Sequence, residues 1–287
     1  MNLDFYIVDV FTDAKYAGNQ LAVFLGAENL SKDKMQQIAK EINFAESTFI
    51  THINKETNTA EIKIFTPEHE MQFAGHPIIG TSWVLMNKIF NNNPSTITMQ
   101  VPVGVIPVTS QDGFIWLQAA QPTFLDVYLK DDFSSFSTLS QDDFDTNFPI
   151  QEVTTGSAFV MVPVKNNEVL GKIVLDKNKA EQWLRQNCKT PHRAFYFFCL
   201  ENEKLSSRMM CIENNQLIED AATGSASSCL QAFLLQYHNP KIKLVNHQGH
   251  FIQRPSQIYF DGTKSGENYE IKIGGKSQFL AKGVWEV

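Results

Sequence analysis

The fold of this chain is decided by two stretches of sequence, Phe73-Ala74-Gly75-His76-Pro77-Ile78-Ile79-Gly80-Thr81 and Asp220-Ala221-Ala222-Thr223-Gly224-Ser225-Ala226-Ser227-Ser228. Each predicts a short loop that turns into a helix at a glycine, and the two glycines, Gly75 and Gly224, lie about half a chain length apart. A glycine at this point lets a ligand approach the backbone closely. The first N–H groups of such a helix have no partner inside it and favour an anion. Two such helix starts facing one cleft would bind a small carboxylic acid.

Composition excludes several classes of function. The 287 residues are 43% hydrophobic and 19% charged with a formal net charge of −7, and no basic stripe is present, so nucleic-acid binding is not expected. The longest apolar stretches, such as 194–200, are too short to span a membrane, and the N-terminus shows no leader pattern. Four cysteines without a CxxC pair favour reduced thiols in a cytoplasmic protein: Cys188, Cys199, Cys211 and Cys229.

Hydrophobic periodicity predicts strands in both halves, with a helix from the N-cap Ser31 to about residue 42. The strands predicted before residue 120 are 4–10, 20–25, 47–53, 59–66, 96–101, 104–110 and 113–118. Those predicted later are 157–164, 194–200, 208–213, 216–219, 241–247, 251–253, 257–260, 269–273 and 278–287. The polar segment 121–150 is interpreted as a crossover. The pattern favours an α+β fold of two similar halves, each with a buried helix among strands; an accidental likeness of the two helix starts is the alternative.

Glu46 is the best candidate for a general acid/base. It stands where the first helix should end and a strand begin, and strand alternation would place it on the same face as Phe44 and Ile50. A carboxyl group among apolar side chains is harder to ionise, which would raise its pKa into a useful range. The alternative is a solvated glutamate at the start of a strand.

Polar groups at the two helix starts are the other candidates. His76 could donate a hydrogen bond to an acid or move a proton, or it could simply cap its own helix. Asp220 could orient a substrate amine or hydroxyl, or serve only the electrostatics of a helix start. Thr223 and Ser225 could each cap the second helix or offer a hydroxyl to a carboxylate. The nearby pair His247 and His250 has no acidic or thiol ligand beside it, so no metal site is expected.

An ordered set of motifs resembles the PhzF-like (phenazine-biosynthesis-type) isomerase family. The set consists of Asp9-Val10-Phe11, Gly18-Asn19-Gln20-Leu21-Ala22-Val23, Asn43-Phe44-Ala45-Glu46-Ser47-Thr48-Phe49, Phe65-Thr66-Pro67, Phe73-Ala74-Gly75-His76-Pro77 and Glu219-Asp220-Ala221-Ala222-Thr223-Gly224-Ser225-Ala226. Each motif alone is weak, but their order is specific, and the likeness extends to the Gln248-Gly249 region.

The resemblance implies a diaminopimelate-epimerase-like fold, in which each of two pseudo-symmetric halves is a strongly curved, mostly antiparallel sheet around a central helix. We expect one half at 1–120, completed by a returning strand at about 278–287, and the other at 121–277. The active site would lie in the cleft between the halves. A homodimer is also implied.

The resemblance further implies a reaction. In the phenazine enzyme a dihydro-hydroxyanthranilic acid is isomerised without a metal or an organic cofactor, as a glutamate takes a proton from one ring carbon and a proton returns at another. Carried over by motif, that glutamate is Glu46, assisted by His76 and Asp220. The groups implied to bind the substrate are Asn19, Gly75, Thr223, Gly224 and Ser225.

The chain departs from the family pattern beside these residues. Gln20 replaces a proline, Ala45 a serine, and Ala221-Ala222 a Pro-Val pair, so the phenazine precursor itself is doubtful as substrate. The leading hypothesis is a cofactor-free isomerase acting on a small cyclic or amino carboxylic acid. A racemase using two thiols is disfavoured, because Ala74 and Ala222 stand where its cysteines should be. A binding or regulatory protein that lost turnover is the third hypothesis.

Overall fold

The computed structural model describes residues 1–188, 194–213 and 215–287. The chain forms two compact units: unit 1 comprises Met1–Gln118 and Gly274–Val287, and unit 2 comprises Ala119–Ile273. Unit 2 is therefore continuous in sequence, whereas unit 1 is assembled from both ends of the described chain.

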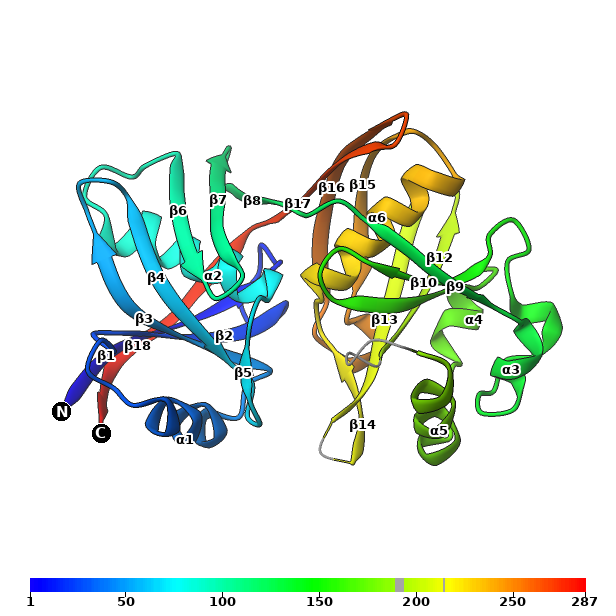
Figure 1. The fold of residues 1–287 in the computed structure, drawn as a ribbon, viewed down its shortest axis with the longest axis horizontal. Coiled ribbons are helices and arrows are strands. Elements are labelled where there is room, and N and C mark those ends of the chain that lie inside the picture. Colours follow the sequence, from blue (N-terminus) through cyan, green and yellow to red (C-terminus); the bar gives the residue numbers. More distant parts are fainter. Residues whose placement is uncertain (189–193, 214) are drawn as a thin grey trace. The chain divides into compact units, whose positions relative to one another are not determined.

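Unit 1 is rich in strands (Figure 1). Its elements are β1 (Asn2–Val10), β2 (Asn19–Leu25), α1 (Lys32–Ile42), β3 (Glu46–Asn54), β4 (Thr59–Phe65), β5 (Glu70–Met71), α2 (Gly75–Val84), the π-helical turn η1 (Leu85–Ile89), β6 (Thr96–Val101), β7 (Gly104–Gln111), β8 (Phe114–Gln118) and β18 (Ser277–Glu286).

Unit 2 has the same kind of construction with additional short helices. Its elements are β9 (Thr123–Tyr128), α3 (Lys130–Ser134), η2 (Gln141–Asp143), β10 (Ile150–Thr154), β11 (Ala158–Pro163), α4 (Asn167–Gly171), α5 (Lys177–Asn187), β12 (Ala194–Glu201), β13 (Lys204–Glu213), β14 (Gln216–Asp220), α6 (Gly224–Tyr237), β15 (Lys241–Gln248), η3 (His250–Ile252), β16 (Ser256–Ser265) and β17 (Asn268–Gly275).

The two units repeat one pattern of strand pairing. In unit 1, β1–β2, β3–β4, β4–β5 and β6–β7 are antiparallel, while β2–β3 and β4–β6 are parallel. In unit 2, β10–β11, β12–β13, β13–β14 and β15–β16 are antiparallel, while β11–β12 and β13–β15 are parallel. Since the same order of parallel and antiparallel neighbours occurs twice, the prediction of two similar α+β halves is confirmed.

The two glycine-opened helices are the cores of their units. Ile78 and Ile79 of α2, and Leu230 and Phe233 of α6, have no accessible surface. In Figure 1 each of these helices lies among the strands of its own unit. A helix that is apolar on nearly every side is stable only when other elements surround it, which explains why the curved sheets form around these two segments.

Amphipathic helices cover the outer side of the sheets. In unit 1, Met35 and Ile38 of α1 pack in a cluster with Phe24 and Phe49, and Ser31 caps the helix as predicted. In unit 2, α3 and α5 contribute to a larger cluster. The segment 121–150, interpreted from sequence as a polar crossover, contains β9 and α3 and supplies fully buried phenylalanines to that cluster.

Unit 1 is completed by a strand, β18, that follows unit 2 in the sequence, whereas the corresponding strand of unit 2, β9, belongs to that unit's own sequence. β18 follows β17 and pairs antiparallel with β1, from Asn2↔Glu286 to Val10↔Ser277. β9 follows β8 and pairs antiparallel with β10. Both chain ends therefore lie side by side in unit 1 (Figure 1), where the Val287 amide donates to the Met1 carbonyl at 2.8 Å.

The predicted strand 251–253 is wrong. His250–Ile252 forms a 3-10 turn between two residues in the left-handed backbone region, Gly249 with φ 78° and Gln253 with φ 60°. An extended strand cannot pass through two left-handed residues, so β15 ends at Gln248 and β16 begins only at Ser256.

Gly249 is expected to tolerate no side chain. A Cβ at this position would lie 2.2 Å from the Arg254 carbonyl oxygen and 2.6 Å from that of Ala221. We expect Gly249→Ala to lower the free energy of unfolding by about 1–3 kcal/mol, measured by urea denaturation. Gly266→Ala is the matched control, since Gly266 also has a positive φ of 58° but has nothing within 4 Å of the added Cβ. Equal losses in the two variants would contradict the close approach at Gly249.

Candidate active site

Glu46 is the first residue of β3 in unit 1. Helix α1 ends at Ile42 and is capped by Asn43, whose left-handed backbone turns the chain. Glu46 then pairs with Leu21 of the parallel strand β2. Its side chain is 19% exposed. Phe44, which strand alternation predicted on the same face, packs instead with the cluster around Phe49. The carboxyl of Glu46 contacts a polar partner.

That partner is His76, the second residue of α2. His76 is 3% exposed, and its Nδ1 lies 3.1 Å from Oε2 of Glu46. Its Nε2 lies 3.2 Å from the backbone carbonyl oxygen of Gln20 in β2. The structure thus brings together two of the predicted catalytic residues, which are separated by 30 positions in the sequence.

The Gln20 contact determines where the imidazole carries its proton. A backbone carbonyl only accepts hydrogen bonds, so Nε2 of His76 must be the donor. Its Nδ1 then faces the Glu46 carboxyl, and a hydrogen bond between them needs one proton, held either by the imidazolium or by the carboxylic acid. Either placement of the proton is compatible with the observed contact.

The turn that precedes β2 supports this arrangement. Asn19 begins β2 and is buried, one residue before the carbonyl that fixes His76. Gly18 before it has φ 70°, and a Cβ there would lie 2.3 Å from the Val10 carbonyl oxygen. The buried Asp9 carboxylate accepts the Tyr16 amide at 2.7 Å and so holds the turn against β1. The glycine of this motif is explained by the close packing of the turn.

Helix α2 begins without a side-chain cap. Gly75 is its first residue, and the N-cap position is Ala74, which has no hydrogen-bonding side chain. Pro77 lies in the first turn, where a missing N–H is tolerated. The N-terminus of α2 therefore presents backbone amides beside His76.

Helix α6 in unit 2 also begins without a side-chain cap, for a different reason. Its N-cap residue is Thr223, which bonds none of the helix amides through its side chain. The Thr223 hydroxyl instead lies 2.5 Å from Oδ2 of Asp220. Gly224 is the first residue of the helix and is buried, whereas Ser225 in the first turn is partly exposed.

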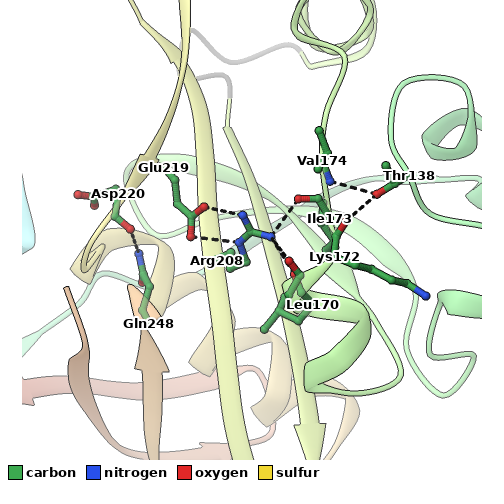
Figure 2. A network of polar contacts seen from close by, with 10 residues as sticks. Thr138, Leu170, Lys172, Ile173, Val174, Arg208, Glu219, Asp220 and Gln248 are labelled. Carbon is green, nitrogen blue, oxygen red and sulfur yellow. Dashed lines mark hydrogen bonds and ion pairs between the residues drawn. The ribbon is translucent and has the colours of Figure 1, made fainter. Parts of the chain in front are cut away.

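Gln248 is a residue of this cluster that sequence reasoning did not propose for the site. Its side-chain amide contacts the Asp220 carbonyl, the Thr223 amide and the Thr223 hydroxyl, at 3.0, 3.2 and 2.9 Å. Figure 2 shows the Gln248 side chain reaching from its strand to Asp220. The only signal in the sequence was the Gln248-Gly249 pair at the end of the motif series.

A buried tyrosine lies behind Gln248. The Tyr196 hydroxyl donates to Oε1 of Gln248 at 2.8 Å, and Ser207 and Asn246 donate to the Tyr196 oxygen at 3.0 and 2.8 Å. Burial raises the pKa of Tyr196 to about 12, so the hydroxyl keeps its proton at neutral pH.

The strand β14 that carries Asp220 is held by a buried ion pair. Arg208 of β13 donates to both carboxylate oxygens of Glu219, through Nε at 3.1 Å and Nη2 at 2.6 Å. Its Nη1 donates to the carbonyl oxygens of Leu170 and Ile173 at the end of α4, at 2.9 and 3.0 Å. Figure 2 shows these hydrogen bonds around the guanidinium group of Arg208.

The cysteines are expected to be unreactive in the folded protein. Cys229 is fully buried within α6, and burial raises the pKa of its thiol to about 12; burial likewise raises the pKa of Cys199 to about 11. Because a raised pKa leaves the thiol protonated at pH 8 and only the thiolate reacts, we expect iodoacetamide to label neither residue until denaturant is added. Peptide mass mapping checks this. Labelling of Cys229 in the native state would contradict its burial and revive a thiol mechanism.

Two further findings concern the described residues as a whole. No three His, Cys, Asp or Glu side chains among them are gathered so that they could hold a metal ion. Within the same residues, no helix has the length and apolar character needed to cross a membrane.

Comparisons with known proteins define the class to which this chain belongs. Among curated proteins, the trans-2,3-dihydro-3-hydroxyanthranilate isomerase of Pseudomonas aeruginosa is 28% identical over 97% of this chain and 98% of its own length. An uncharacterised isomerase of Pasteurella multocida is also 28% identical, over 99% of this chain and 93% of the relative. The protein is thus an isomerase.

Solved structures share the fold of this chain. A phenazine biosynthesis protein of the PhzF family from Bacillus anthracis superposes with a TM-score of 0.87 at 24% identity and 100% coverage of both chains. A hydroxyproline epimerase from Agrobacterium vitis shares the fold, with a TM-score of 0.64 at 10% identity over 99% of this chain and 92% of the other. The family model described as phenazine biosynthesis-like protein matches residues 8–283, and the chain belongs to this family.

Proposed function

We propose that this isomerase moves a proton between carbon atoms of a small cyclic or amino carboxylic acid, with Glu46 as the general acid/base. The observation that carries the proposal is the contact of 3.1 Å between the Glu46 carboxyl and Nδ1 of His76. A carboxylate beside an imidazolium can accept a proton from carbon, and the same carboxyl group can return a proton at another carbon. His76 stabilises whichever charge state the glutamate takes.

The second cluster suits recognition of the acid. The backbone amides at Gly224 and the hydroxyl of Ser225 lie at the uncapped start of α6, where a carboxylate is favoured. Asp220 would accept a hydrogen bond from a hydroxyl or amine on the substrate. Gly75 and Asn19 would likewise form hydrogen bonds with the substrate, beside Glu46.

The relatives suggest which acids to test first. Several curated relatives act on trans-2,3-dihydro-3-hydroxyanthranilate. Three residues near the candidate site differ from the family pattern, namely Gln20, Ala221 and Ala222. The backbone carbonyl of Gln20 contacts His76, and the two alanines directly follow Asp220 in the sequence. We therefore propose a substrate that shares the carboxylate and the acidic carbon but differs in its other substituents.

Proton NMR in D₂O tests the proposed reaction. A panel of small carboxylic acids, including dihydro-hydroxyanthranilate and common amino acids, is incubated with the wild-type protein. We expect deuterium to appear at carbon, or a double bond to move, for at least one acid. Measurable binding of an acid without exchange would contradict the proposed catalysis and favour a binding protein.

A further inference from the structure

The Gln248 side chain can adopt only one amide orientation. Its Nε2 faces the Asp220 backbone carbonyl, which only accepts, and its Oε1 faces the Thr223 backbone amide, which only donates. A flipped amide would place two donors against each other and two acceptors against each other. The backbone at the start of α6 therefore determines which end of the amide carries the hydrogens.

This orientation gives the Thr223 hydroxyl a fixed direction. Nε2 of Gln248 donates its second hydrogen to Oγ1 of Thr223 at 2.9 Å. The single hydroxyl hydrogen of Thr223 is then directed to Oδ2 of Asp220, 2.5 Å away. Thr223 has no hydrogen left for a substrate, and one carboxylate oxygen of Asp220 is held in place.

The residues behind Gln248 prevent its amide from moving. The Tyr196 hydroxyl donates to Oε1 of Gln248, and Tyr196 in turn accepts from Ser207 and Asn246. The side chains of Tyr196, Asn246 and Gln248 have no accessible surface. Since breaking any of these bonds would leave a buried polar group unpaired, the chain of donors is rigid.

We infer that Thr223 and Gln248 are positioning residues that hold the Asp220 carboxylate in one orientation at the start of α6. The inference rests on the proposed function, because Asp220 is there the group that receives the substrate. It assigns Thr223 a role through Asp220 in place of direct contact with substrate. It also assigns a positioning role to Gln248. The place of Gln248 at the end of strand β15 does not by itself reveal this role.

Four variants test the inference. Thr223→Val keeps the shape but removes the hydroxyl, and Thr223→Ser keeps the hydroxyl. Gln248→Met removes the amide, and Gln231→Met is its matched control, because Gln231 is also fully buried in unit 2 yet its amide bonds none of the described residues. Each variant is assayed for deuterium exchange on the acid identified with wild type, and its crystal structure gives the conformation of Asp220.

We expect Thr223→Val and Gln248→Met to lower kcat on the order of 10- to 100-fold, as misplacement of a reacting group does, with a smaller change in KM. Thr223→Ser and Gln231→Met should retain most of the wild-type rate. In the crystals, Asp220 should keep a single conformer in these two variants and lose it in Thr223→Val and Gln248→Met.

Two results would overturn the inference. One is an Asp220 side chain that keeps its wild-type conformer in both Thr223→Val and Gln248→Met. The other is a loss in Thr223→Val confined to KM, which would indicate that the hydroxyl binds substrate directly. If the wild-type protein exchanges no proton on any acid, the proposed function fails, and the Asp220 conformer alone still decides whether Thr223 and Gln248 position it.

Discussion

Glu46→Gln is expected to reduce the rate of proton exchange by about 10²–10⁴-fold, the usual cost of losing a positioned general base. Glutamine keeps the size of the side chain and can still bond His76, but it cannot accept a proton from carbon. The loss should therefore appear in kcat, with a smaller change in KM, because the substrate still meets the same surface. The measurement is the initial rate of deuterium incorporation by NMR under saturating acid.

Glu61→Gln is the matched control for this experiment. Glu61 is an exposed residue of β4 in the same unit. The Glu61→Gln variant therefore makes the same chemical change away from the site. We expect its exchange rate to equal that of wild type. A Glu46→Gln protein that is folded and exchanges at the control rate would exclude Glu46 as the base.

Glu219→Ala is expected to destabilise the protein by about 3–5 kcal/mol, because it leaves the Arg208 guanidinium buried without its counter-charge. The two side chains are only 10% and 11% exposed, and Glu219 accepts two of the guanidinium's hydrogen bonds. The carbonyl oxygens of Leu170 and Ile173 remain, but they carry no full negative charge. Urea denaturation measures the loss as a lower midpoint with an unchanged slope.

A surface pair gives the comparison for that experiment. Glu181 and Arg185 form an ion pair one helical turn apart on α5, and the Arg185 side chain is 59% exposed. Glu181→Ala should change stability far less than Glu219→Ala, since water solvates the charge that is left. Similar losses of stability in both variants would show that breaking the Arg208–Glu219 pair costs no more than breaking a surface pair.

The local parts of the candidate site could be predicted from the sequence. A glycine followed by His76 and Pro77 at a helix start, and a glutamate where a helix gives way to a strand, are short-range patterns. The contact between Glu46 and His76 could not be predicted from spacing. It depends on the parallel register of β2 and β3 and on how closely α2 packs against them.

The same distinction between short-range patterns and long-range contacts explains where the predicted fold differs from the structure. The segment 121–150 has many acidic and small residues, so its buried Phe133 and Phe144 were hidden in a pattern typical of a loop. Phe251 and Ile252 predict a strand over 251–253, whereas the left-handed Gly249 and Gln253 enclose a turn. Gln248 has no local feature that marks it, because its partners are reached only once β15 lies beside α6.

The pairing of β18 with β1 has a consequence for the order in which the chain folds during its synthesis. Unit 2 is continuous and can fold as soon as residue 273 has left the ribosome. Unit 1 is translated first but must wait for its missing strand, so β1 spends that time with one open edge. We expect the first part of the chain to be the second to reach its native state, and the interval before β18 emerges to be the period in which a nascent chain most needs protection from aggregation.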